Sequence, residues 1–208
     1  MIKYSIVMPA LNEEDYIRTP LISLNKQLDE NGEIIVVDNE CSDSTAEIAE
    51  HYGARVIKAP RGKLNARDAG IRAAKGEVII ATDADTYYPQ GWLQKMLSYF
   101  AWNQIAGVGG NRVYEKDVWW SRFIPSRNRF FGGNSAFLKQ AYLDSGGFNL
   151  NINQFSLLSM VREEELRLKK LLRKHGKVII DRRLCVITSS RRFHDAAFKE
   201  QVKKGERF

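Results

Sequence analysis

Short apolar runs alternate with helix-length amphipathic segments through the first half of the chain. Each run is rich in valine and isoleucine and is bounded by turn-forming residues, a pattern that predicts buried strands. Strands that alternate with helices indicate a parallel sheet built from βαβ units. The four strands expected from this pattern span residues 4–8, 33–38, 54–59 and 77–82.

Helices are expected after these strands, because residues that favour helix starts precede each helix-forming segment. A proline in the first turn costs no hydrogen bond, since the N–H that it lacks would be unpaired there. The expected starts are Thr19 with Pro20 in the first turn, Ser42 or Asp43, Lys63 and Pro89.

The second half is less regular, and residues 115–131 are aromatic and basic with no clear period. The expected elements are a strand at 107–114, a short helix between the glycine pairs at 132–133 and 146–147, a helix at 162–174, and short strands at 177–181 and 185–188. No repeat or low-complexity linker divides the chain. One α/β domain with an irregular second half is therefore expected.

The composition allows a substantial core and predicts no membrane span. Hydrophobic residues make up 44% of the 208 residues. No apolar run reaches the roughly 18 residues that a membrane-spanning helix needs. The opening "MIKYSIVMPALNEE" reaches a proline and carboxylates too early for a signal peptide. Two cysteines, Cys41 and Cys185, suit a reducing compartment, so a cytoplasmic protein is expected.

The net charge of +7 is confined to the C-terminal quarter. Residues 162–208 contain 15 Lys and Arg against 7 Asp and Glu, whereas the preceding residues are balanced to within one charge. A basic end can face nucleic acid, anionic lipid or a phosphorylated substrate, or it can be plain solvated surface. No nucleic-acid-binding motif is present, so no nucleic-acid partner is expected.

Two aspartates, Asp83 and Asp85, directly follow the expected strand at 77–82. Aspartate is a common turn residue, so this triplet alone does not establish a metal site. Mg²⁺ and Mn²⁺, however, bind through one or two carboxylates together with substrate phosphates. In α/β sheets ligands bind at the carboxyl ends of the strands, where Asn12, Asp38 and Asp83 all fall.

Cationic residues add to this pattern. The segment "RGKLNARDAG" places Lys63 and Arg67 at the start of an expected helix, where the helix N-terminus favours anions. Such residues are also common as plain surface. Together with a carboxylate-bound metal at the strand ends, they indicate a site for a nucleoside diphosphate.

Several segments stand in a recognisable order along the chain: "SIVMPALNEE", "IIVVDNECSDST", "RGKLNARDAG", "ATDADTYYP", "GGNSAFLKQAYLDSGGFN" and "REEELRLKKLLRKHG". In their order and spacing the chain resembles the inverting family-2 glycosyltransferases over about residues 4–192. The resemblance implies a single GT-A domain with a mostly parallel central sheet and helices on both faces. Residues of about 1–112 would bind the nucleotide sugar, and about 113–208 would bind the acceptor and supply the base.

The resemblance also implies residue roles. Asp85 would be the direct metal ligand, Asp83 would contact the metal or the ribose, and Arg67 would meet the nucleotide or its diphosphate. The implied nucleoside pocket consists of Pro9, Leu11, Asn12, Glu13 and Asp38. Possible acceptor residues are Trp119, Trp120, Gly133 and Asn134.

Members of the family carry a Glu-Asp pair whose aspartate is the catalytic base. Counting back from Gly176 places this pair at Glu164 and Glu165, so a glutamate would replace the aspartate. Glu165 is the favoured base and Glu164 the next candidate, with the register left open by the three glutamates at 163–165. These glutamates could instead be a negative first turn that complements the helix dipole.

Two other departures are Asn39, where the family has an aspartate, and Asp68, where it has an asparagine. The glutamate in the base position also leaves open a protein that binds nucleotide sugars but catalyses weakly. A sugar nucleotidyltransferase is a further alternative. That class should carry a basic glycine-rich loop after the first strand, and this chain has the acidic "PALNEE" there.

An inverting transfer needs a carboxylate to take the acceptor proton and a cation to stabilise the departing diphosphate. Mn²⁺ or Mg²⁺ is therefore the expected cofactor, and a UDP-sugar is the favoured donor. The late segment "TSSRRFH" could close over the diphosphate through Arg191 and Arg192. His194 could be a further metal ligand or an exposed tail residue.

The acceptor is open to a glycan, a protein-linked group or a lipid-linked group. Trp119 and Trp120 lie in "DVWWSRFIPSRNRFF", which could form an acceptor or membrane-interface surface or could simply pack under the irregular half. With the basic tail, this segment permits a lipid phosphate acceptor and peripheral attachment to an anionic membrane, at its inner face.

Overall fold

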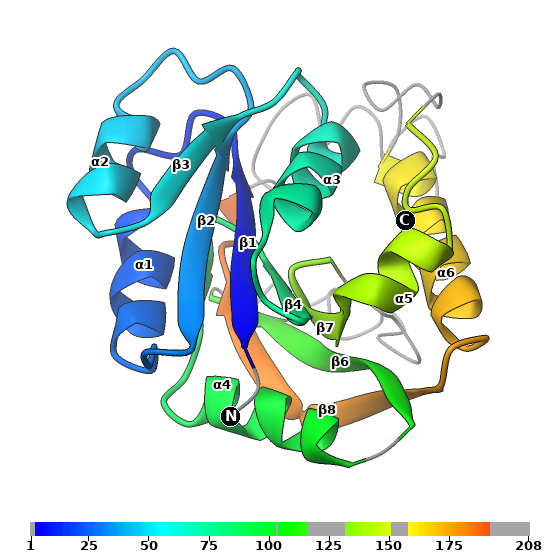
Figure 1. Ribbon diagram of the computed structural model, residues 1–208. Coiled ribbons are helices and arrows are strands. Elements are labelled where there is room, and N and C mark those ends of the chain that lie inside the picture. The colour runs from blue at the N-terminus through cyan, green and yellow to red at the C-terminus, as the bar shows by residue number, and fades with distance from the viewer. Residues whose placement is uncertain (1–2, 103, 116–131, 151–157, 192–208) are drawn as a thin grey trace.

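The computed structural model describes residues 3–102, 104–115, 132–150 and 158–191, and its strands form one eight-stranded sheet (Figure 1). The strands are β1 (Tyr4–Ala10), β2 (Gly32–Asp38), β3 (Arg55–Lys58), β4 (Val78–Thr82), β5 (Thr86–Tyr87), β6 (Ile105–Tyr114), β7 (Asn134–Leu138) and β8 (Lys177–Thr188). The helices are α1 (Arg18–Asn25), α2 (Thr45–His51), α3 (Lys63–Ala73), α4 (Trp92–Ser98), α5 (Lys139–Asp144) and α6 (Leu158–Leu172), and a short 3₁₀ helix spans Tyr99–Ala101.

The sheet is mixed, with the order β3-β2-β1-β4-β7-β6-β8-β5. Parallel pairing joins β3, β2, β1 and β4, and it also joins β6 to β8. Strand β7 is antiparallel to β4 and β6, and β5 is antiparallel to β8. The first four strands therefore send their carboxyl ends to one edge, which lies at the top of Figure 1.

The four strands expected in the first half are confirmed, with small differences at the helix starts. Strand β1 continues to Ala10, two residues beyond the expected end at residue 8, so Pro9 lies in the strand, opposite Val37. Thr19 is not a cap, because α1 begins at Arg18 after Ile17, although Pro20 does lie in the first turn. Helix α4 begins at Trp92, after Pro89.

The second half contains more strand than its sequence pattern indicates. Strand β7 lies in the segment where only a short helix was expected, and α5 follows it directly. The two short strands expected near the C-terminus are one strand, β8. The register of β8 against β6 slips between Ile180 and Cys185, so the polar residues there interrupt the apolar pattern without ending the strand.

Helix α6 runs from Leu158 to Leu172 and has no acidic residue in its first turn. The glutamates at 163–165 therefore lie inside the helix, and the alternative in which they are a negative first turn is wrong. Successive helical residues point about 100° apart, so these side chains must face different neighbours.

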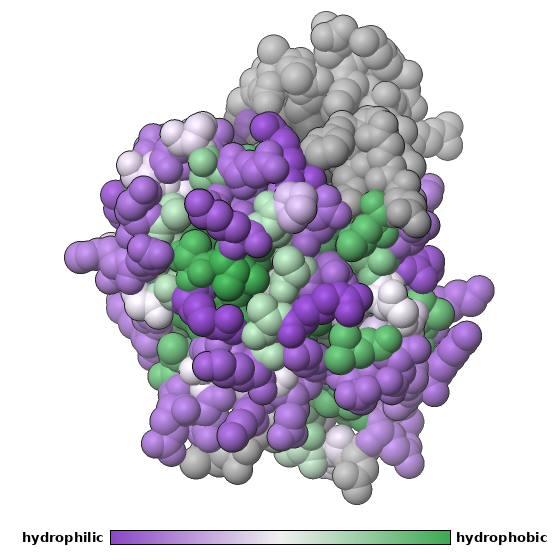
Figure 2. Space-filling model, turned by 45° about the horizontal axis from the view of Figure 1, so that its top comes forward, coloured by the Kyte–Doolittle hydropathy of each residue, from purple (hydrophilic) through white to green (hydrophobic). Residues whose placement is uncertain are grey.

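Both faces of the sheet are buried. One core cluster contains side chains of α1, α2 and α4, and a second contains side chains of α3, α5 and α6. In β2, Ile34 and Val36 belong to the first cluster and Ile35 and Val37 to the second, as the alternation of a strand requires. Because both faces of the sheet are covered, a binding site for a ligand is expected at the carboxyl edge of the sheet. Figure 2 turns this edge forward and shows polar side chains around a smaller apolar area.

Within the described part of the chain, none of the helices combines the length and the hydrophobicity needed to cross a bilayer.

Candidate functional site

Two loops meet at the carboxyl ends of β1 and β2. Asn12 has a positive φ of 53°, and its side-chain Oδ1 accepts the backbone N–H of Ser42 at 2.9 Å. Asp38, at the end of β2, accepts the backbone N–H of Cys41 at 2.7 Å through Oδ1. These bonds hold the predicted nucleoside-binding residues at one edge of the sheet.

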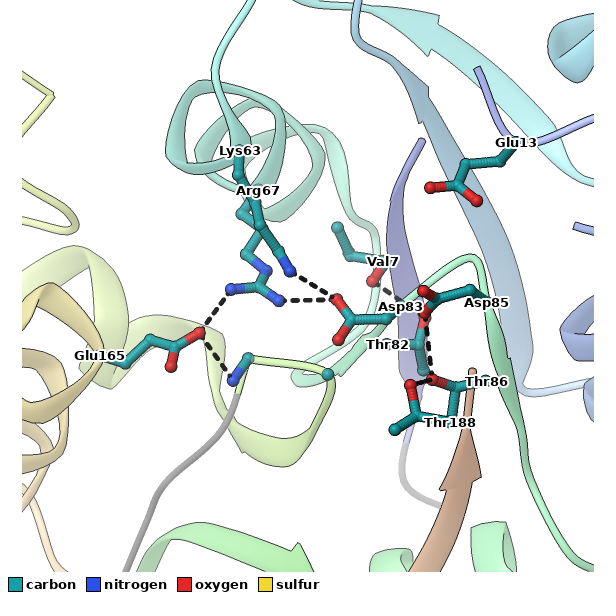
Figure 3. A network of polar contacts seen from close by, with 12 residues as sticks. Val7, Glu13, Lys63, Arg67, Thr82, Asp83, Asp85, Thr86, Glu165 and Thr188 are labelled. Atoms are coloured by element: carbon teal, nitrogen blue, oxygen red, sulfur yellow. Dashed lines mark hydrogen bonds and ion pairs between the residues drawn. The ribbon is translucent and has the colours of Figure 1, made fainter. Parts of the chain in front are cut away.

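Arg67, on α3, lies at the centre of a charged cluster between β4 and α6 (Figure 3). Its side chain is only 2% exposed. Nη1 donates to Oε1 of Glu165 at 2.6 Å, and Nη2 donates to Oδ1 of Asp83 at 2.9 Å. Lys63, one helical turn earlier, places its Nζ 3.1 Å from the same Asp83 oxygen. Two cations thus converge on one carboxylate.

Burial alone would lower the pKa of the Arg67 guanidinium, because the charged form loses its water. The carboxylates of Asp83 and Glu165 outweigh this effect, and the pKa lies above its ordinary value. Arg67 is therefore a fixed positive charge. It joins the end of β4 to α6, and its partner on α6, Glu165, lies 98 residues away from it in the sequence.

Tyr88 holds the backbone beside this charged cluster. Its side chain is fully buried, its Oη accepts the backbone N–H of Asp83 at 2.8 Å, and it donates to the carbonyl of Gly133 at 3.0 Å. Burial raises the pKa of Tyr88 well above its usual range, so the hydroxyl remains a neutral donor. The hydroxyl fixes the end of β4 to the glycine pair before β7.

The glycine pair is needed because the side chains approach it closely. A Cβ on Gly133 would lie 1.9 Å from Oδ2 of Asp83, and one on Gly132 would lie 2.0 Å from Nη1 of Arg67. The backbone N–H of Gly132 donates to Oε1 of Glu165 at 3.0 Å. Any side chain at either position would displace the charged cluster.

Neighbouring glutamates of α6 face different surroundings. Glu165 faces Arg67 and the glycine pair, as described above. Glu164 accepts the N–H of Asn149 at 2.8 Å and pairs with Nε of Arg167 at 2.9 Å. It therefore holds the loop after α5. Of these two candidates for the base, only Glu165 contacts the cluster that contains Asp83.

A second cluster surrounds Asp85, on the side of Asp83 away from Lys63 and Arg67. Figure 3 shows Glu13 and Asp85 on this side. Nη2 of Arg191 donates to the carboxylate of Glu13 and lies 3.4 Å from Oδ2 of Asp85. The guanidinium also stacks 3.9 Å from the centre of the Tyr16 ring. Arg191 thus joins the loop after β1 to the turn after β4.

The donor set fits a hard divalent cation. Asp83 and Asp85 offer carboxylate oxygens at a strand end, and positive side chains already lie against both of them. Among the described residues, no group of three or more His, Cys, Asp or Glu side chains forms a complete protein cage for a metal. Such a site fits a cation that takes the rest of its ligands from substrate phosphates and water.

Other predicted residues lie elsewhere or outside the described ranges. Pro9 and Leu11 are partly buried at the end of β1. Asn134 is 1% exposed and binds Nε1 of Trp92 and the carbonyls of Asn111 and Leu184, so its acceptor role remains a prediction. The positions outside the described ranges are Trp119, Trp120, Arg192 and His194.

Two departures from the family pattern have structural surroundings. Asp68 accepts the hydroxyl of Tyr142 and Nε of Arg72, both at 2.7 Å, so its charge is paired within the fold. Burial, with Asp68 nearby, raises the pKa of Tyr142, which keeps its proton as the donor. Asn39 is 5% exposed, and its Oδ1 is buried with no hydrogen-bond partner among the described residues.

Sequence reasoning did not find Tyr16 and Tyr88. A tyrosine outside a regular helix or strand does not indicate a role by itself. The available signal for Tyr88 was its position in "DADTYYP", where an aromatic residue follows the carboxylates and precedes a proline.

Replacing Tyr88 with phenylalanine is expected to lower the free energy of unfolding by about 1–3 kcal/mol, since two buried backbone groups lose their partner. It should also weaken nucleotide-sugar binding, because Asp83 loses its backbone anchor. Chemical denaturation and titration calorimetry measure the two effects. Tyr99→Phe is the matched control, since the Tyr99 hydroxyl binds Asp181 at 2.7 Å, outside this site. Equal binding losses in the two variants would contradict a specific role for Tyr88.

Comparison with known proteins identifies the family of this chain. The family model described as "Glycosyl transferase family 2" matches residues 5–163. A dolichyl-phosphate hexose transferase of Haloferax volcanii is 33% identical over 138 residues, which is 66% of this chain and 57% of that protein. The chain therefore spans little more than half the length of this relative.

Two solved structures share the fold. A mannosyltransferase from Pyrobaculum calidifontis, in complex with GDP-Man and Mn²⁺, has a TM-score of 0.69 at 18% identity over 89% of this chain and 56% of its own. Glucosyl-3-phosphoglycerate synthase from Mycobacterium tuberculosis, with Mn²⁺, UDP-glucose and phosphoglyceric acid, has a TM-score of 0.65 at 19% identity over 88% of this chain and 70% of its own. The GT-A fold expected from the sequence is confirmed, and the chain belongs to glycosyl transferase family 2.

Proposed function

We propose that this protein transfers a sugar from a nucleoside diphosphate sugar to an acceptor, with a divalent cation and with inversion at the anomeric carbon. The observation that carries the proposal is the bridge made by Arg67. This one buried guanidinium contacts Asp83, on the expected donor side, and Glu165, on the expected acceptor side. A reaction between two substrates requires both to be held in one geometry. A side chain that contacts both parts of the site can fix their positions relative to each other.

On the donor side, Asp85 would bind the cation, with Asp83 at the cation or the ribose. Bound Mn²⁺ or Mg²⁺ would act as a Lewis acid that stabilises the charge on the departing diphosphate. Lys63 lies beside Asp83 and would add positive charge near that diphosphate. Arg67 is held by two ion pairs, so its proposed role is to position Asp83 and Glu165 rather than to bind the nucleotide directly.

On the acceptor side, Glu165 would be the general base. Among the described residues, Arg67 and Gly132 both bind its Oε1, which leaves Oε2 as the oxygen that would take the acceptor proton. Attack from the side opposite the diphosphate would invert the anomeric carbon in one step. The enzyme would then need no nucleophilic residue of its own.

The donor would be a UDP-sugar or a GDP-sugar, with UDP favoured. Asp38 and Asn12 would line the nucleoside pocket at the ends of β2 and β1. Titration calorimetry with UDP- and GDP-linked hexoses, with and without Mn²⁺, tests this step. Tight binding of one nucleotide class that requires Mn²⁺ is the expected result. No binding of any nucleotide sugar with Mn²⁺ present would contradict the proposal.

The acceptor would carry a hydroxyl or a lipid-linked phosphate. The dolichyl-phosphate hexose transferase of Haloferax volcanii supports the lipid phosphate. The aromatic and basic residues around Trp119 and Trp120 and the basic tail support an anionic membrane as the place where the acceptor is met.

We expect the protein to sediment with liposomes that contain anionic lipid. Each basic residue near such a surface contributes about 1 kcal/mol. Binding should fall with salt, as the Debye length shrinks from about 10 Å at 0.1 M to about 3 Å at 1 M. Trp119→Ala with Trp120→Ala should weaken it further, since apolar insertion is not screened. Absence from anionic and neutral liposomes alike at low salt would favour a soluble acceptor.

A further inference from the structure

Arg191 binds two carboxylates that come from distant parts of the chain. It pairs with Glu13, after β1, and with Asp85, after β4. The two carboxylate side chains are only 9% and 7% exposed, whereas that of Arg191 is 26% exposed. Two nearly buried anions at one place need a cation, because each has lost most of its water. Arg191 supplies that cation.

One of these two carboxylates, that of Asp85, is also the proposed ligand of the divalent metal. A metal ion on Asp85 would lie within a few ångströms of the Arg191 guanidinium in its present position. Like charges at such a distance repel each other strongly when they are shielded from water. Metal on Asp85 and Arg191 between Glu13 and Asp85 are therefore competing arrangements.

The surroundings allow Arg191 to move while its backbone stays in place. Arg191 lies three residues after the end of β8, and the N–H of Ser189, between them, donates to the carbonyl of Asp85 at 3.0 Å. This bond lies in the backbone and does not depend on the guanidinium. The Nε of Arg191 is buried and has no hydrogen-bond partner among the described residues, so the side chain has donor capacity that its present position does not use.

We propose that Arg191 is a displaceable counter-ion of the metal site. Without nucleotide, its guanidinium occupies the cation position between Glu13 and Asp85. The metal that arrives with the nucleotide sugar displaces it, and the guanidinium turns to the diphosphate. Metal and nucleotide therefore bind cooperatively, and the metal alone binds weakly. This inference rests on the proposed function, because it takes Asp85 as the metal ligand.

The test measures binding of Mn²⁺ to the protein in the absence of nucleotide. Electron paramagnetic resonance of the free ion reports how much Mn²⁺ remains unbound. Arg191→Gln removes the competing charge and should bind Mn²⁺ about tenfold more tightly than wild type, within the usual range of coupling between two ligands. Arg191→Lys keeps the charge and should stay near wild type. Arg183→Gln is the matched control, since Arg183 is on β8 but pairs with Asp181.

A second measurement adds a nucleoside diphosphate. It should raise the Mn²⁺ affinity of the wild type by a larger factor than that of Arg191→Gln, because the variant has no guanidinium left to displace. Arg191→Met is a second neutral variant, which can replace Arg191→Gln if thermal unfolding shows that the latter is not folded.

Mn²⁺ binding by Arg191→Gln no tighter than by Arg183→Gln would overturn the proposal. That result would leave the glycosyltransferase function intact. No Mn²⁺ binding by any variant, with or without nucleotide, would instead contradict the metal site of the proposed function itself.

Discussion

Replacing Asp85 with alanine is expected to reduce nucleotide-sugar turnover by about a thousandfold or more. The carboxylate is the proposed direct ligand of the cation, and a metal that acts as a Lewis acid contributes several kcal/mol to the transition state. A loss of about 4 kcal/mol corresponds to about a thousandfold in rate. Release of the nucleoside diphosphate, followed with a coupled assay at saturating Mn²⁺, measures the effect.

The control for this variant is Asp144→Ala, which removes an exposed carboxylate of α5 and should leave turnover unchanged. Chelation with EDTA should stop the wild-type enzyme, and added Mn²⁺ should restore it. Undiminished turnover in saturating EDTA would contradict metal dependence.

The second large effect is expected for Glu165→Gln. Loss of a general base reduces the rate by about 10²–10⁴. The glutamine keeps the size of the side chain and an oxygen for Arg67 and Gly132, so the fold and the nucleotide affinity should be retained. Transfer to a hydroxyl acceptor at saturating donor, together with calorimetry of donor binding, separates the two properties.

Glu164→Gln is the matched control, because Glu164 lies next in the helix but pairs with Arg167. It should keep most of the transfer rate. The reverse pattern would place the base one residue earlier, and full transfer by both variants would show that neither glutamate is the base. A phosphate acceptor needs no deprotonation, so a much smaller loss with a lipid phosphate than with a hydroxyl would further support Glu165 as the base.

The sequence predicts the carboxyl edge of the sheet well, because its signals there are local. Valine- and isoleucine-rich runs locate β1, β2 and β4, and the polar residue that follows each run falls at the same edge. Strand β7 was missed because it is a short run between the glycine pair and a helix. The polar residues at 181–183 inside β8 hid the continuity of that strand.

The pairing of charges at the site could not be predicted from the sequence. Arg67 was expected to meet the nucleotide, since a helix start rich in cations usually faces an anion. In the structure it is buried between Asp83 and Glu165, and the second of these partners is 98 residues away. The charge-balancing contact of Arg191 with Glu13, across 178 residues, has the same character. Long-range ion pairs follow from the topology of the sheet, which single-sequence patterns do not contain.

Phosphorus-31 nuclear magnetic resonance of a reaction mixture is the direct test of the proposed sugar transfer. The protein, Mn²⁺, a nucleotide sugar that binds in calorimetry and a membrane extract supplying acceptors are followed over time. The nucleotide sugar is expected to disappear and the nucleoside diphosphate to appear, with no pyrophosphate, and neither change is expected with Asp85→Ala. A second mixture contains a nucleoside triphosphate and a sugar 1-phosphate in place of the nucleotide sugar. Pyrophosphate formed in this second mixture, with the nucleotide sugar left intact in the first, would contradict the proposed transfer and would indicate a nucleotidyltransferase.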